Sequence, residues 1–439
     1  MPLQFPYCLG HGSVPKLPVA GSFSVLQSEI ALIHTHTYEN GLVLVAEEMQ
    51  HLESAAFTLL LPAGAIYDPE AKAGLASFTC EMMLRGCGSR DGREFIDDLE
   101  NLGVDRGESV SNTHTAYSGS MLAENLYAAL DIYADLILRP HLPEDRMESG
   151  RQVVLQEVLS IEDEPGHKVM QQLKEQHLRA PYGRSSYGSV EGLEAVEHAD
   201  LKRFWQAQYV PGGAVLGVAG RLDWEALRDH VGKLLGGWTG NVVQEIEPDD
   251  RGQRHLHLPF DSNQTQIGIA YESVPYSHED YFHASAGVGA LSSGSSARLF
   301  TEVREKRGLC YSVYASYYST RREGAILCYA GTSAERAQET LDVTLAELRR
   351  LPLGIEEFEL QRLKARVKSA LMMQQESSMS RTMAIVRDWY HLGRVRTRDE
   401  LGALVDKLTV DSINRYLAEH PPQDLTVVTL GPQPLVLSE

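Results

Sequence analysis

Three side chains that can serve as nucleophile, base or metal ligand lie close together in the first quarter of the chain. Residues 74–86 read Gly-Leu-Ala-Ser-Phe-Thr-Cys-Glu-Met-Met-Leu-Arg-Gly. A helix over this stretch places Ser77 and Glu81 on one face, with Cys80 beside them. A hydroxyl, a thiol and a carboxylate in this arrangement offer metal binding or nucleophilic catalysis. Cys80 has no evident partner base, which favours a small apolar helix residue over a nucleophile.

A second stretch combines a guanidinium with a phenol. Residues 292–316 read Ser-Ser-Gly-Ser-Ser-Ala-Arg-Leu-Phe-Thr-Glu-Val-Arg-Glu-Lys-Arg-Gly-Leu-Cys-Tyr-Ser-Val-Tyr-Ala-Ser. The pattern predicts a short amphipathic helix that ends at Gly308, followed by an alternating strand. Arg304 falls on the helix and Tyr311 on the strand, seven residues later. By spacing alone, the two are a surface charge and an ordinary strand aromatic.

The elements that must hold these residues occur twice, with a period of roughly 205–212 residues. Each copy begins with a helix that leads to a glycine, over 94–99 in the first copy and 299–304 in the second. An amphipathic helix follows, over 124–130 and 337–343, and then a charged helix, over 144–161 and 356–375. Each copy ends with a strand, over 214–220 and 425–431. The stretch 236–252, rich in Gly, Asp and Glu, separates the two copies. We therefore predict an N-terminal α+β domain (1–240), a linker (241–252) and a C-terminal α+β domain (253–439).

Composition limits the classes of function. The chain of 439 residues is 43% hydrophobic and carries a formal net charge of −20. It can build a sizeable core, and its acidity argues against nucleic acid or an anionic membrane as partner. No apolar run reaches the length of a membrane span, and no signal-peptide pattern is present. Five cysteines without metal-type spacing indicate a reduced compartment, so we expect a cytoplasmic protein.

From about residue 40 to its end, the chain resembles the pitrilysin/insulinase family of inverted zincins. The resemblance is carried by the frame of residues 74–86 and by the string Arg-Leu-Phe-x-x-Val-Arg-Glu-Lys-x-Gly-Leu-x-Tyr over residues 298–311. It implies an α+β fold of two homologous domains in a clamshell arrangement. Each domain would be a mixed, mostly antiparallel sheet with helices packed on one face.

The resemblance also assigns the zinc-motif positions. The family's helix carries His-x-x-Glu-His; in that register the two histidines fall on Ser77 and Glu81, and the catalytic Glu falls on Cys80. The family's third ligand, a distant Glu, falls on Glu157, 76 positions after Glu81. Zinc hydrolysis needs the imidazoles and a carboxylate base, so we expect no metal in this chain. A residual site of two hard carboxylates and a soft thiolate is disfavoured.

Two further features follow from the resemblance. Arg304 and Tyr311 match a pair that the family's C-terminal half supplies; a Tyr hydroxyl can donate to an oxyanion, and an Arg fork can hold substrate carbonyls. Residues Ser109, Val110 and Ser111 match an edge strand that pairs with extended peptide, an ordinary polar edge strand being the alternative. We expect His114 nearby to be a strand residue on a polar face.

Together these features predict the non-zinc subunit of a two-chain zinc metallopeptidase that is inactive alone. A homologous partner would bring zinc and the base, and Arg304 and Tyr311 would complete a composite site for unfolded peptides. One alternative is a catalytically inactive structural or binding subunit of a larger complex. Another is an independent peptidase with an unusual metal site, which the missing histidines disfavour.

Overall fold

The structure is a computed structural model that describes residues 32–240 and 246–437. The described residues belong to one compact unit. The predicted N-terminal domain includes residues 1–31, which lie outside the described residues, as do 241–245 of the predicted linker. The described part of that linker, 246–252, contains no helix or strand. The division into domains at this point stays a prediction.

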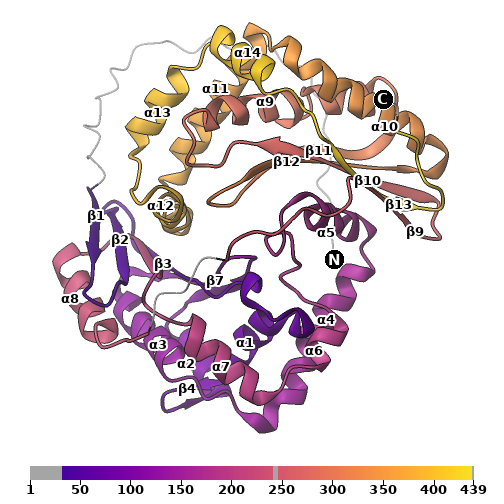
Figure 1. Cartoon of the computed structure of the whole chain (residues 1–439). Helices are drawn as coiled ribbons and strands as arrows, with labels where there is room; N and C mark the ends of the chain where they lie inside the picture. The colour runs from indigo at the N-terminus through magenta and orange to yellow at the C-terminus, as the bar shows by residue number, and fades with distance from the viewer. Residues whose placement is uncertain (1–31, 241–245, 438–439) are drawn as a thin grey trace, which may run out of the picture. The chain divides into compact units, whose positions relative to one another are not determined.

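The first half of the chain builds a six-stranded sheet (Figure 1). In spatial order its strands are β1 (Leu32–Thr37), β2 (Val43–Glu48), β8 (Val215–Gly220), β3 (Ser54–Leu61), β7 (Thr115–Leu122) and β6 (Asp105–Val110). Strands β2 and β8 pair in parallel, and the other neighbours pair antiparallel. The order leaves β6 at one edge of the sheet. A separate short pair consists of β4 (Gly86–Cys87) and β5 (Arg90–Asp91).

The second half repeats this plan in a five-stranded sheet. Its spatial order is β11 (Cys310–Ser319), β12 (Gly324–Ser333), β10 (Gln264–Ser273), β13 (Thr426–Gly431) and β9 (His255–Pro259). Strands β13 and β9 are parallel, and the other neighbours are antiparallel. Both sheets are therefore mixed and mostly antiparallel, as the resemblance implied. Strands β8 and β13 confirm the strands predicted at the end of each repeat.

Helices complete both halves. Those of the first half are α1 (Leu75–Met83), α2 (Gly92–Asn101), α3 (Leu126–Leu138), α4 (Met147–Glu162), α5 (Pro165–His177), α6 (Val190–Glu194), α7 (His198–Gln208) and α8 (Trp224–Leu235). Those of the second half are α9 (Tyr281–Ser292), the π-helix η5 (Phe300–Glu305), α10 (Ala337–Arg350), α11 (Glu357–Gln374), α12 (Ser378–Leu392), α13 (Arg398–Asp406) and α14 (Val410–Glu419). The predicted charged helices correspond to α4 and α11.

Two helices are exchanged between the halves. Helix α5 follows α4 in the first half but packs on β10 and β13 of the second sheet, where Val169 and Leu173 are buried (Figure 1). Helix α12 follows α11 in the second half but packs on β2, β3 and β8 of the first sheet, where Ile385 and Val386 are buried. Each sheet thus gains a helix on its second face. The sequence pattern did not predict this exchange.

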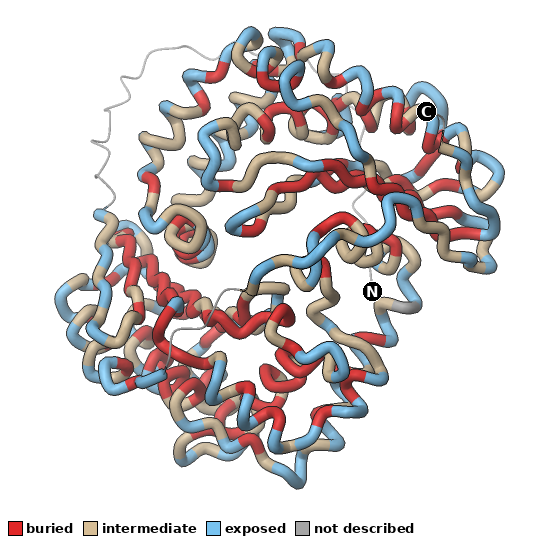
Figure 2. The backbone as a smooth tube through the Cα atoms, viewed as in Figure 1, coloured by how far each residue is buried: buried red, intermediate tan, exposed pale blue. Residues whose placement is uncertain are grey.

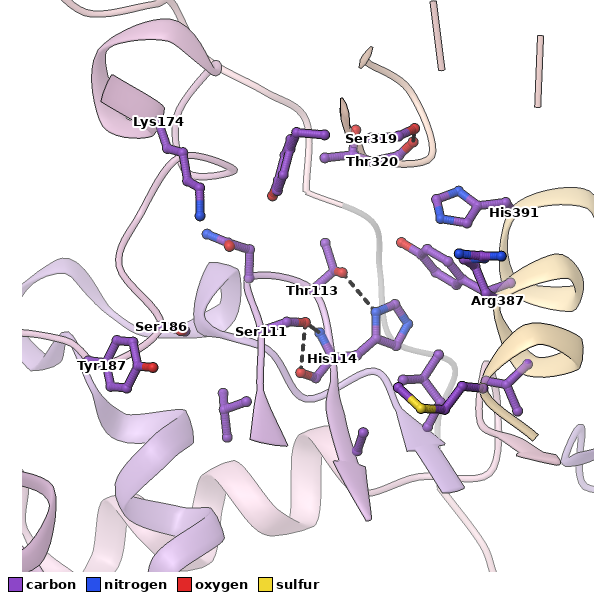
Figure 3. Close-up of a pocket in the computed structure, with 18 of the residues that line it drawn as sticks. Ser111, Thr113, His114, Lys174, Ser186, Tyr187, Ser319, Thr320, Arg387 and His391 are labelled. Atoms are coloured by element: carbon purple, nitrogen blue, oxygen red, sulfur yellow. Dashed lines mark hydrogen bonds between the residues drawn. The ribbon is translucent and has the colours of Figure 1, made fainter. Parts of the chain in front are cut away.

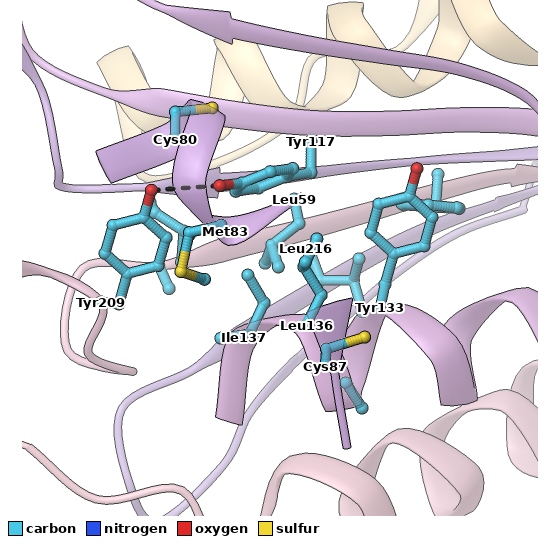
Figure 4. Close-up of a cluster of buried hydrophobic side chains, with 14 of the residues drawn as sticks. Leu59, Cys80, Met83, Cys87, Tyr117, Tyr133, Leu136, Ile137, Tyr209 and Leu216 are labelled. Carbon is cyan, nitrogen blue, oxygen red and sulfur yellow. Dashed lines mark hydrogen bonds between the residues drawn. The ribbon is translucent and has the colours of Figure 1, made fainter. Parts of the chain in front are cut away.

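The buried residues concentrate along the strands and on the helix faces that cover them (Figure 2). In the first half, the core beneath α1 contains Phe57, Phe78 and Tyr117, all fully buried. The hydroxyl groups of Tyr117 and Tyr209 lie 3.1 Å apart within this core (Figure 4). Burying aromatic side chains of this size stabilises a fold by about 1.5–3 kcal/mol each, so the core holds α1 in place.

Candidate functional site

Helix α1 begins at a defined backbone position. Gly74 precedes it with φ +102°, a left-handed conformation that favours glycine. The Asp68 carboxylate accepts hydrogen bonds from the backbone N–H groups of Gly74 (2.8 Å) and Ala76 (2.9 Å). A carboxylate at a helix N-terminus satisfies N–H groups that have no partner within the helix. These contacts fix where Ser77, Cys80 and Glu81 fall along the helix.

Ser77 and Glu81 are both engaged with other protein groups. The Ser77 hydroxyl donates to the backbone carbonyl of Ser186 at 2.6 Å. The Glu81 carboxylate accepts from Arg85, with the Nη2–Oε1 distance 2.6 Å and the Nε–Oε1 distance 3.1 Å. Arg85 also donates to Ser149 on α4. Both positions that match the family's histidines are thus bound to other groups of this chain.

Cys80 points into the core, beside the ring of Tyr117 (Figure 4). The residue is 6% exposed. Burial raises the pKa of the Cys80 thiol to about 12. A thiol in this environment stays protonated near neutral pH, and only a thiolate is a good nucleophile or metal ligand. The structure therefore agrees with an apolar helix residue at this position.

Glu157 lies on α4, which packs against α1. Burial and, second, the charge of Glu81 raise the pKa of the Glu157 carboxyl. Glu81 and Glu157 therefore lie on two helices that pack against each other.

The residues at these positions do not fit a zinc ion. Zinc in a peptidase centre takes neutral imidazoles and an ionised carboxylate, whereas Ser77 is a hydroxyl and Glu81 is paired with Arg85. Within the described residues, no three His, Cys, Asp or Glu side chains are arranged to hold a metal. Glu157 would be the one free ligand of the family's set. No chemical step of this chain is therefore assigned to a metal.

Arg304 and Tyr311 contact each other. The Arg304 guanidinium carbon lies 4.9 Å from the centre of the Tyr311 ring and 4.7 Å from that of the Phe300 ring. Both distances are typical of cation–π interactions. The planar guanidinium thus packs against two rings at once.

A β-bulge sets the direction of Tyr311. Cys310 pairs with Thr332 and Ser312 with Gly331, so the register of β11 shifts around Tyr311. A bulge leaves the extra residue unpaired and re-aims its side chain. Tyr311 is 84% exposed as a result. Simple alternation along the strand did not predict this.

The two constellations have different neighbours. Among the described residues, η5 packs on β11 and α10, whereas α1 packs on α4, α6, α7 and β6. The structure thus brings Arg304 to Tyr311 and Glu81 to Glu157. It does not pack one pair against the other.

The strand with Ser109 and Val110 is the edge strand β6, and Ser111 is the first residue after it. β6 pairs with β7 on one side, with Ser109 opposite Ala116. Ser111 forms a tight turn, in which its N–H donates to the His114 carbonyl at 2.7 Å. His114 lies in this turn and is buried, so its prediction as a strand residue on a polar face is wrong. The turn buries the ring against Tyr390 of α12, at 4.3 Å between centroids.

A cavity of about 580 Å³ lies beside this turn (Figure 3). Residues from β6, the β6–β7 turn, α5, the end of β11 and α12 line it. The cavity is faced by Lys174 of α5 on one side of the turn that carries Thr113. On the other side of this turn it is faced by Arg387 and His391 of α12 (Figure 3). Sequence reasoning missed this cavity because its walls come from segments more than 200 residues apart that only the helix exchange brings together.

Comparison with known proteins decides the family. The profile described as insulinase (peptidase family M16) matches residues 43–189, and the profile described as the peptidase M16 inactive domain matches residues 195–367. The chain belongs to the pitrilysin/insulinase family. The first profile covers Ser77, Cys80, Glu81 and Glu157, and the second covers Arg304 and Tyr311.

The relatives extend over nearly the whole chain. An uncharacterized zinc protease of Bacillus subtilis is 26% identical over 91% of this chain and 98% of its own length. The beta subunit of the mitochondrial processing peptidase of Saccharomyces cerevisiae is 25% identical over 93% of each chain. A crystal structure of a peptidase M16 inactive domain from Pseudomonas fluorescens superposes with a TM-score of 0.84, at 23% identity, over 92% of this chain and 100% of that one. This last likeness supports the two-sheet fold.

No helix in the described part of the chain combines the length and hydropathy needed to cross a membrane.

Proposed function

We propose that this pitrilysin/insulinase-family protein is the non-zinc subunit of a two-chain peptidase. A homologous partner carries the zinc centre and the base. This chain contributes Arg304 and Tyr311 to a composite site that cleaves unfolded peptides. The yeast relative is by name one subunit of an enzyme, which supports a partnered arrangement.

The contrast between the two constellations carries the proposal. Ser77 and Glu81 are bound to protein groups, and Cys80 is buried. Tyr311, in contrast, presents its ring at 84% exposure, with Arg304 stacked on it. Large exposed aromatics often mark surfaces that bind a partner or a ligand.

The chemistry of the pair suits acyl transfer. When water adds to a peptide carbonyl, the oxygen acquires negative charge, and the Tyr311 hydroxyl can donate a hydrogen bond to it. The Arg304 fork can donate to substrate carbonyls on either side. Its stacking between Phe300 and Tyr311 limits its rotation, so less entropy is lost when it binds.

The test is steady-state cleavage of a quenched-fluorescence peptide. This chain is co-expressed with a family member from the same genome that carries intact His-x-x-Glu-His. Tyr311→Phe should lower kcat by about 10²–10³ with little change in KM, because the hydroxyl acts on the transition state. Arg304→Ala should also raise KM. Tyr314→Phe, on the same strand and 40% exposed, is the matched control and should leave both constants unchanged.

Assembly of each variant is checked by size exclusion. Unchanged kcat for Tyr311→Phe and Arg304→Ala in an assembled, active complex would remove the catalytic role and favour a structural or binding subunit. We further propose a cytoplasmic location, since Cys80, Cys87, Cys310 and Cys328 are free thiols.

A further inference from the structure

The cavity beside the β6–β7 turn has an unusual charge for this protein. Asp and Glu make up 60 of the 439 residues, against 40 Lys and Arg. Yet no Asp or Glu lines the cavity among the described residues. The titratable cationic and imidazole side chains that line it are Lys174, Arg387, His114, His167 and His391. An acidic chain thus encloses a cavity with only positive or neutral groups.

Lys174 on α5 provides the first cation. Its ammonium lies 5.7 Å from the centre of the Tyr318 ring, which also lines the cavity. Among the described residues, it forms no ion pair with a carboxylate. Burial lowers its pKa, and no neighbouring carboxylate counteracts this shift. A half-buried ammonium without a counter-ion favours an incoming anion.

Arg387 on α12 provides the second cation. Its guanidinium carbon lies 5.3 Å from the centre of the Tyr276 ring, and it too forms no carboxylate pair among the described residues. The adjacent Asp388 is already bound, because Arg396 and the Tyr276 hydroxyl both donate to it. Next to it on the cavity wall, the buried Nδ1 atom of His391 has no hydrogen-bond partner.

Two carboxylates close in sequence to the cavity-lining residues of α5 have other partners. Glu164 pairs with the exposed His167 at 3.6 Å. Glu175 accepts from the side chains of Gln171 and Gln172. Neither carboxylate lines the cavity. They therefore do not cancel the charges of Lys174 and Arg387 inside it.

The cavity also adjoins the free edge of β6. Val110 at the end of this strand and Ser111 after it are part of its lining. A peptide that adds to the β6 edge would project alternate side chains toward the two faces of the sheet. One side-chain position would then open onto the cavity that Lys174 and Arg387 line.

We propose that this cavity is a subsite for a carboxylate of a bound peptide. The carboxylate is either an Asp or Glu side chain or the C-terminal group. Lys174 and Arg387 supply the attraction for the carboxylate. The inference rests on the proposed function only in taking the ligand to be a peptide. It gives this chain a preference for acidic peptides.

Fluorescence anisotropy with this chain alone tests the subsite, because binding needs no partner. The probes are labelled peptides of about twelve Gly, Ala and Ser residues, with two central Glu, two Gln or two Lys, each with a free or an amidated C-terminus. The Glu peptide should bind about tenfold more tightly than the Gln peptide, and the Lys peptide most weakly. Raising the salt concentration should reduce this preference. Loss of affinity on amidation alone would assign the site to the C-terminal carboxylate.

Variants locate the effect. Lys174→Met and Arg387→Met should each remove most of the preference for Glu, while Lys202→Met and Arg415→Met, at exposed positions outside the cavity, should retain it. Equal binding of all peptides, or a preference for Glu that survives both cavity variants, would overturn the subsite. Either result would leave the roles of Arg304 and Tyr311 untouched, since those depend on kcat in the assembled complex.

Discussion

Arg381 on α12 and Glu47 on β2 form a buried ion pair that joins the two halves of the chain. The Nη2–Oε2 distance is 2.6 Å, and the side chains are 4% and 2% exposed. The partners lie 334 residues apart. Beside them, the hydroxyls of Thr58 and Thr382 lie 2.9 Å apart. These contacts fix the exchanged helix α12 on the first sheet.

Breaking this ion pair should destabilise the protein strongly. Arg381→Met leaves the Glu47 carboxylate buried without a partner, which costs about 3–5 kcal/mol of unfolding free energy. The double variant Arg381→Met/Glu47→Leu should recover much of this loss. Arg394→Met, which breaks an exposed pair with Glu400, should cost less than about 1 kcal/mol. Urea unfolding followed by circular dichroism measures all three. Equal losses for Arg381→Met and Arg394→Met would contradict the role given to the buried pair.

Helix α12 approaches the first sheet closely at Gly217 on β8. A Cβ atom added there would lie 2.3 Å from Cγ2 of Val386. Gly217→Ala should therefore lower the unfolding free energy by about 1–3 kcal/mol, the usual cost of overpacking. Val386→Ala in the same chain should restore part of it. At Gly402 in α13 a Cβ would meet nothing within 4 Å, so Gly402→Ala should be neutral or stabilising. If Gly217→Ala proves as harmless, α12 does not lie against β8 at this position.

The sequence allowed the repeated elements to be predicted because their patterns are local. Residues 425–431 form a short run rich in apolar and β-branched side chains, and the structure has β13 there. The exchange of α5 and α12 cannot be predicted from local patterns. The apolar face of α5 that contains Val169 would fit either sheet equally well. Which sheet α5 covers depends on how far the short connection after α4 allows α5 to reach. The cationic cavity depends on the same exchange.

For the candidate site, the sequence likewise allowed the residues to be predicted but not their contacts. Tyr311 follows Arg304 by seven positions, and the family string pointed to both residues. Their stacking depends on the bulge at Tyr311, which a pairing partner across the sheet imposes. The burial of His114 could not be predicted from the sequence either, because Tyr390 from the other half of the chain covers its ring.

Histidines at the packing between the halves should make the protein sensitive to acid. Burial, and then nearby arginines, lower the pKa of His177 and of His391 to about 4 and that of His114 to about 3. Unfolded histidines titrate near pH 6.5. Below that pH the unfolded state binds more protons, so stability falls as pH decreases toward 4, by up to about 1.4 kcal/mol per pH unit for each histidine.

Substitution identifies which histidine contributes. His177→Gln should make the pH dependence of the unfolding free energy shallower between pH 6.5 and 4, because Gln does not titrate. The exposed His255, on the edge strand β9, is the control, and His255→Gln should leave the slope unchanged. Thermal or urea unfolding at several pH values gives the slopes. Parallel curves for the native chain and His177→Gln would rule out His177 as a source of the acid sensitivity.

Two substitutions on α1 should create a metal site at the zinc-motif positions. Ser77→His with Glu81→His places two imidazoles four residues apart on α1, facing Glu157 on α4. This double variant should bind about one equivalent of zinc, whereas the native chain should retain well below one after dialysis. The substitution also removes the partner of Arg85, but Ser149 still accepts from its Nη1 atom at 2.9 Å. Cys80 can stay unchanged, because the general base is not a ligand. Metal analysis and chelator titration provide the measurement.

Adding Glu157→Gln to the double variant tests the third ligand. Zinc affinity should fall by about tenfold or more, because a neutral amide binds zinc much less well than a carboxylate. Cys80→Glu in the same background restores the complete motif but places a carboxylate at a position that is 6% exposed, beside Tyr117. That triple variant should bind zinc yet unfold more readily than the double variant. A folded double variant that takes up no zinc would show that the helix register, or the assignment of Glu157, is wrong.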